Sequence, residues 1–171
     1  QGRQRRRGAE PQADAGPLSL APAMPPSVLC TGLPQQTVLA WQLAGEAPSS
    51  LVIRVGITQL ADQALRHAPP RPSELEHAID LVEEALTGLP HSWPAGALLQ
   101  PAGLFDLMLP HLGDLGRSAV EDLFQRLASW SLGHPSAAQG LPQDCMFIAA
   151  ALLLRELTHH LSFETLAPNA G

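Results

Sequence analysis

The sequence has no lysine and no tyrosine, and only two of its 171 residues are cysteines. All ten basic residues are therefore arginines, which excludes mechanisms that require a lysine Schiff base or a Walker-type phosphate lysine. Charged residues make up 15% of the chain, below the roughly 25% of an average soluble domain. Much of the surface must therefore be neutral, rich in loops, or covered by a partner.

The two cysteines, Cys30 and Cys145, are far apart in the sequence and belong to apolar runs. This usage predicts buried free thiols in a reducing compartment rather than a disulfide. The longest apolar run, residues 145–154, is about half the length needed to cross a bilayer. We therefore predict a cytoplasmic protein without a transmembrane segment.

Residues 1–26 contain four of the arginines, several prolines and no hydrophobic periodicity, which predicts a disordered leader. The first seven residues hold these four arginines, so the rest of the chain has six arginines against sixteen acidic residues, a net charge of −10. Such an acidic body argues against nucleic-acid binding. We predict one folded α/β domain over residues 27–171.

Three short strands are expected at residues 28–31, 37–43 and 51–55, because β-branched and apolar residues are separated by turns rich in glycine and proline. They would form an antiparallel meander. After Gly56 the hydrophobic period changes to that of a helix, which we expect to run to about His67 and to stop before the proline pair at 69–70.

The remaining pattern is mainly helical. Two capping boxes, Ser73 with Glu76 and Ser118 with Glu121, predict helix starts, and Asp144 is the expected N-cap of a final helix to about residue 161. A short strand is expected at 97–99, followed by an apolar helix at 104–111. Strands and helices together indicate a mixed α/β fold with about five helices.

No catalytic motif is present, and the candidate metal ligands have simpler explanations. Glu76, Asp80 and Glu84 lie on one helix face and could bind a divalent cation, but such stripes are usually solvated. His159 and His160 point about 100° apart on a helix, so both cannot easily bind one ion. We predict no catalytic residue, no metal site and no cofactor.

The order of elements resembles a known family. It is similar to the second lobe of the exopolyphosphatase and guanosine pentaphosphate phosphatase (Ppx/GppA) family. The likeness lies in the strand, turn and strand pattern of residues 29–55, the helix starts near 57 and 73, the strand at 98–103, the helix at 118–132, and the late segments 141–144, 149–154 and 161–166. The resemblance implies a single lobe of the actin-like, or RNase H-like, fold. In that family phosphate lies between two lobes, and we expect only one of them here, because a 26-residue leader precedes the first strand.

By this resemblance two loops would be the phosphate cradles. Their residues here are Gly32, Gln35, Gln36 and Thr37 in the first loop and Ala102 and Gly103 in the second. A cradle requires converging backbone N–H groups, whereas Pro34 and Pro101 each remove one donor. The sequence therefore indicates a degenerate, catalytically inactive relative, a pseudoenzyme.

Three functions remain open at this point. The first is a binding, regulatory or scaffold module that uses an exposed apolar face to form a homodimer or to bind another protein chain. The second is a phosphohydrolase acting on polyphosphate or a nucleotide, completed by a second lobe or subunit. The third is an unrelated small α/β interaction protein. Separate hairpin and helical units would favour this third function, whereas one sheet shared by the meander and the later strand would favour the family resemblance.

Overall fold

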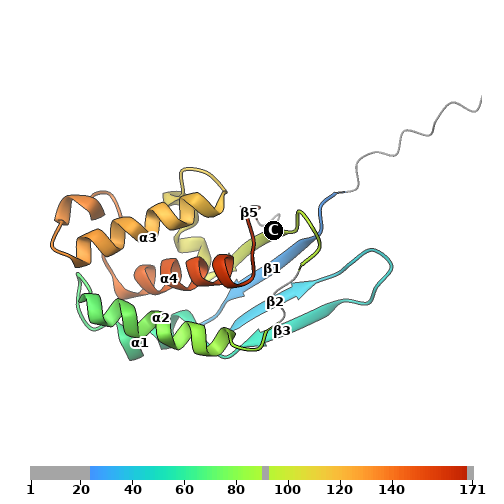
Figure 1. Ribbon diagram of the computed structural model, residues 1–171, viewed down its shortest axis with the longest axis horizontal. Coiled ribbons are helices and arrows are strands. Elements are labelled where there is room, and N and C mark those ends of the chain that lie inside the picture. Colours follow the sequence, from blue (N-terminus) through green and yellow to red (C-terminus); the bar gives the residue numbers. More distant parts are fainter. Residues whose placement is uncertain (1–23, 90–92, 169–171) are drawn as a thin grey trace, which may run out of the picture.

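The computed structural model describes residues 24–89 and 93–168, so most of the predicted leader lies outside the described residues. Five strands form one sheet in the order β3-β2-β1-β4-β5 (Figure 1). Their bounds are β1 Ser27–Gly32, β2 Thr37–Trp41, β3 Ser49–Ile53, β4 Leu98–Gly103 and β5 Thr165–Leu166. The three predicted strands and the later short strand are thus confirmed, and they share one sheet.

The sheet is mixed. Strand β1 pairs antiparallel with β2, which pairs antiparallel with β3, so the predicted meander is present. Strand β4 runs parallel to β1, and β5 runs parallel to β4. Because the meander and β4 belong to one sheet, the alternative of separate hairpin and helical units is wrong.

The α-helices lie on one side of this sheet, with α4 in contact with the other three (Figure 1). They are α1 Ile57–Ala64, α2 Pro72–Leu86, α3 Arg117–Ser131 and α4 Cys145–His160. The connections from β1 to β4 and from β4 to β5 step in the same direction along the sheet. Since crossovers between parallel strands are right-handed, both must pass over the same face.

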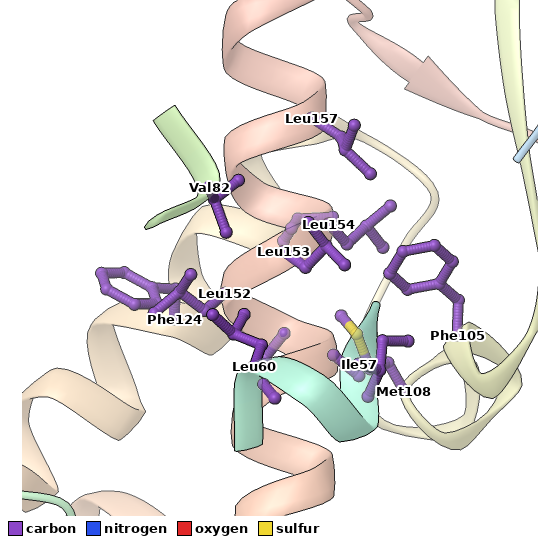
Figure 2. Packing of buried hydrophobic residues seen from close by; sticks show 14 of the residues in the cluster. Ile57, Leu60, Val82, Phe105, Met108, Phe124, Leu152, Leu153, Leu154 and Leu157 are labelled. Atoms are coloured by element: carbon purple, nitrogen blue, oxygen red, sulfur yellow. The ribbon is translucent and has the colours of Figure 1, made fainter. Parts of the chain in front are cut away.

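Helix α4 is the centre of the core, as its nearly uniform apolar sequence predicts. It contacts α1, α2 and α3, and its side chains Leu152, Leu153 and Leu154 are fully buried (Figure 2). Leu60 of α1 and Val82 of α2 pack around it. The stripe predicted for α3 is also buried, from Val120 to Trp130.

The two predicted capping boxes are wrong. Helix α2 begins at Pro72, one residue before Ser73, because proline suits the first helical position; its third residue, Glu74, accepts a hydrogen bond from the Arg71 N–H at 2.8 Å. Helix α3 has Gly116 as its N-cap, without a side-chain cap. The Asp144 cap is confirmed, since its carboxylate accepts a hydrogen bond from the Phe147 N–H at 2.9 Å.

Three further predictions need correction. The segment 104–111 forms two short 3₁₀ helices, η1 Leu104–Leu107 and η2 Leu109–His111, because Pro110 cannot donate within an α-helix. Helix α1 ends at Ala64, earlier than predicted. Cys30 is buried as expected, but Cys145 is only partly buried; both are free thiols.

Among the described residues, the helices pack on one face of the sheet, and the strand side chains that point to the second face are less buried (Figure 1). Its side chains include Leu29, Val38 and Ala40, which are partly exposed, and Val52, which is 49% exposed. None of the five strands contains a charged residue. We call this side of the sheet, from β3 to β4, the open face. In the described part of the chain, no helix is long and apolar enough to span a membrane.

Candidate functional site

The predicted loops meet at the carboxyl ends of β1 and β4. Gly32 is the register partner of Gly103 across these parallel strands, and of Thr37 across the hairpin. Gly103 has a φ of +68°, and a Cβ on it would lie 2.5 Å from the Gly32 carbonyl oxygen. Only glycine fits here without strain. The fold therefore brings both loops to one edge of the sheet.

The β1–β2 turn is packed against the start of α1. The N–H groups of Ile57 and Gln59 donate to the carbonyl oxygens of Leu33 and Pro34, at 3.0 Å and 2.9 Å. The Leu33 N–H donates to the Gln36 carbonyl within the turn. A helix N-terminus can bind an anion only through unpaired N–H groups. Here the turn itself takes two of those donors.

Thr37 is fully buried, and its hydroxyl donates to the Val55 carbonyl at 2.8 Å. This bond ties β2 to the segment that follows β3, so the hydroxyl is already engaged. Ala102 is also buried, whereas Gln35 and Gln36 are exposed. Of the six predicted residues, the two glutamines therefore offer side chains to solvent, and none of the six carries a charge.

Apolar side chains fill the inner side of the strand ends. A Cβ on Gly32 would lie 2.7 Å from Ile57 Cδ1 and 2.9 Å from Phe105 Cδ2. Ile57 and Phe105 are fully buried, and both lie near Met108 beside α4 (Figure 2). Pro34 and Pro101 add carbonyl oxygens but no N–H groups at this edge. Its donor set is thus poor for holding phosphate.

A polar cluster that sequence reasoning missed lies between α3 and α4. Arg155 donates from Nε to Glu121 at 2.8 Å and from Nη1 to Glu156. Gln125 also donates to Glu121. Partial burial alone would raise the pKa of Glu121, but the hydrogen bonds from Arg155 and Gln125 outweigh it and hold that pKa at about 2.

Glu156 also belongs to a second group, with Glu83 of α2 and His160 of α4. The sequence contained a signal for part of this second group, because Glu156 and His160 are four residues apart and so share a face of α4. No spacing rule connects Glu83 with α4. One group of side chains in the described ranges has the composition and proximity of a metal site, and it consists of these three residues.

Comparison with known proteins bears on the fold. No family model and no curated protein sequence matches the chain. Among solved structures, an Aquifex aeolicus Ppx/GppA phosphatase, crystallised as its type II variant, matches with a TM-score of 0.65 and 11% identity, over 84% of this chain and 53% of that one. An exopolyphosphatase from Cytophaga hutchinsonii matches with a TM-score of 0.55 and 17% identity, over 84% and 52%.

The chain has the fold of one Ppx/GppA lobe. It spans about half the length of the solved structures that it matches. The resemblance seen in the order of elements is thus confirmed for the fold, and the expected actin-like α/β class with it. Identities of 10–17% extend the likeness no further than the fold.

Proposed function

We propose that this Ppx/GppA-like lobe is a catalytically inactive binding or regulatory module that docks a partner protein on its open face. The observation that supports this most directly is that all five strands lack charge, while the helices of the described residues pack on the opposite face (Figure 1). Apolar surface left exposed on a soluble protein commonly marks a protein–protein interaction site.

The edge of the sheet supports the same proposal. Strand β3 is an outer strand of the sheet and contains neither a charged residue nor a proline. Natural proteins usually protect such edges with charges, prolines or covering segments. The uncharged edge and the open face meet at Val52, which is 49% exposed. A second copy of the chain is the first partner to test, because two uncharged surfaces do not repel each other.

Loss of catalysis is supported by the strand ends. The Thr37 hydroxyl donates a hydrogen bond to the Val55 carbonyl, and two N–H groups at the start of α1 donate to carbonyls of the β1–β2 turn. The prolines in both loops have no N–H group to donate. A phosphohydrolase needs groups that stabilise the charge developing on the transferred phosphoryl group. The six residues at these loops are Gly32, Gln35, Gln36, Thr37, Ala102 and Gly103, and they provide no charge.

The test of partner binding is the mass in solution, measured by light scattering on chromatographed protein. We expect a mass at least twice the 18.1 kDa of one chain at micromolar concentrations. Val52→Glu should convert it to a monomer, whereas Leu132→Glu, at a 67% exposed apolar residue just after α3, should leave it associated. A wild-type monomer at high concentration would overturn self-association and direct the search to other chains.

One observation keeps a second function under test. The matched structures include exopolyphosphatases, and the fold still places Gly32 beside Gly103. A phosphohydrolase completed by another lobe would retain affinity for its anion. Calorimetry with pyrophosphate, short polyphosphate and ATP, with and without Mg²⁺, separates the two proposals: a Kd below about 10 µM, roughly 7 kcal/mol, favours the hydrolase. A titration that gives no heat of binding with any of these anions favours the inactive module.

A further inference from the structure

We propose that Glu83, Glu156 and His160 form a zinc site that links α2 to α4. Each residue offers one ligand atom, and these three atoms lie within 4.8 Å of one another. His160 Nε2 is 3.6 Å from Glu83 Oε1 and 3.5 Å from Glu156 Oε2. The site is separate from the strand ends and from the open face.

Two of the three separations between ligand atoms fit a shared ion, and the third, between the Glu83 and Glu156 oxygens, is at most 4.8 Å. Zinc binds carboxylate oxygen and imidazole nitrogen at about 2.0–2.2 Å, which places neighbouring ligand atoms of a tetrahedral site about 3.3–3.6 Å apart. The two measured separations lie at the upper end of this range. Small rotations of the Glu83 and His160 side chains, which are 51% and 34% exposed, would bring all three atoms onto one ion.

The buried member supplies an independent argument. The side chain of Glu156 is only 3% exposed, on a helix whose other residues are almost all apolar. A carboxylate in such surroundings must be compensated by opposite charge. Arg155 donates to one oxygen, Oε1, and the second oxygen, Oε2, faces His160. A divalent ion at this point would compensate the second oxygen.

Arg155 also positions the ligand. Its Nε donates to Glu121 and its guanidinium lies 4.7 Å from the centre of the Phe124 ring, so it is held from two sides. Through Nη1 it fixes the Glu156 carboxylate with Oε2 turned toward His160. Metal ligands are commonly oriented by such outer hydrogen bonds.

The donor set selects the metal. Two carboxylates and one imidazole suit zinc, and their two negative charges balance its charge. Magnesium prefers oxygen ligands and keeps several waters, so the imidazole disfavours it. Three protein ligands also leave the fourth zinc position to a water molecule. The half-exposed Glu83 side of the cluster gives that position access to solvent.

The test is zinc binding to the full chain after treatment with a chelator. Calorimetry should find one equivalent of Zn²⁺ and no comparable binding of Mg²⁺. His160→Gln and Glu83→Gln should each weaken zinc at least tenfold, because even changes outside the ligands themselves weaken metal sites by about 10–100-fold. Both residues are partly exposed, so both variants should fold, and circular dichroism checks this.

Matched controls come from neighbouring residues. His159→Gln changes the adjacent histidine, which contacts Glu121, and Glu84→Gln changes the adjacent acid on α2. Cys145→Ser removes the partly buried thiol. All three variants should keep the wild-type affinity for zinc. When cobalt replaces zinc, these three variants should show the intense visible absorption of a four-coordinate ion, and His160→Gln should not.

Thermal unfolding gives a second readout. Zinc should raise the midpoint of wild-type protein and of His159→Gln, but not of His160→Gln, since a ligand stabilises only the form that binds it. Absence of zinc binding, equal affinity in His160→Gln, or loss of binding in Cys145→Ser would each overturn the proposal. None of these outcomes bears on partner docking at the open face.

Discussion

The carbonyl oxygen of Gly32 occupies the space next to Gly103 where any other residue would carry its Cβ, with only 2.5 Å between the two positions. This contact joins the ends of β1 and β4, the two strands on which both predicted loops depend. The arrangement therefore depends on glycine at position 103 for two reasons: the positive φ and the close approach of the neighbouring backbone.

Gly103→Ala should lower the free energy of unfolding by about 2–4 kcal/mol, because the strain of a positive φ combined with a ψ of −129°, about 1–3 kcal/mol, adds to the backbone clash. Gly140 is the matched control, since it has a φ of +79° but no atom within 4 Å of the place where a Cβ would lie. Gly140→Ala should lower the free energy of unfolding only by the strain of its positive φ, about 1 kcal/mol. Urea unfolding of both variants measures the difference; equal losses would contradict the role of the Gly32 contact.

Phe105→Ala should destabilise the protein by about 3–5 kcal/mol, because it leaves a cavity beside Gly32, Ile57 and α4. Its side chain is fully buried, whereas Leu107 in the same 3₁₀ helix is 45% exposed. Leu107→Ala should change stability by less than about 0.5 kcal/mol. Chemical denaturation measures both, and a small loss for Phe105→Ala would mean that the strand ends are loosely packed.

Glu121 predicts a particular dependence of stability on pH. Its pKa falls from about 4.5 when unfolded to about 2 when folded, because the hydrogen bonds from Arg155 and Gln125 outweigh the opposing effect of burial. The stabilisation of the folded state by the ionised Glu121 carboxylate is therefore fully present above about pH 5 and is lost as the pH falls toward 2. Glu121→Gln should cost about 1–3 kcal/mol at pH 7, and little near pH 2.

Unfolding of wild type and Glu121→Gln across this pH range measures the predicted convergence. Glu76→Gln, which changes an exposed acid on α2, is the control and should be nearly neutral at every pH. A constant difference between wild type and Glu121→Gln from pH 7 to pH 2 would contradict the prediction.

The two thiols should differ in reactivity. Burial raises the pKa of Cys30 well above its usual range, and its side chain is fully enclosed. Cys145 is partly exposed, although burial and the charges of Asp144 and Glu74 also raise its pKa. A thiol reagent should therefore modify one cysteine in the native protein, slowly, and the second only on unfolding. Cys145→Ser should abolish the native reaction; labelling of Cys30 at the same rate would contradict the enclosed core.

Local sequence rules succeeded where one element decides the outcome. The strand periods located β1, β2 and β3, the apolar run at 145–154 located the central helix, and Asp144 marked where that helix begins. They failed where neighbouring residues compete. Pro72 shifted the start of α2 away from Ser73, and Pro110 divided the segment 104–111 into two 3₁₀ turns.

The sequence by itself determined the α/β class, the order of the elements and the lack of charge in the strands, because these follow from short-range periodicity and composition. Only the tertiary structure decided which residues from distant parts of the chain are in contact. Parallel pairing of β1 with β4 placed Gly103 against Gly32, and packing of α2 on α4 brought Glu83 to Glu156 and His160. Such contacts join residues distant in the chain, and the packing of whole elements sets them, so no local spacing reveals them.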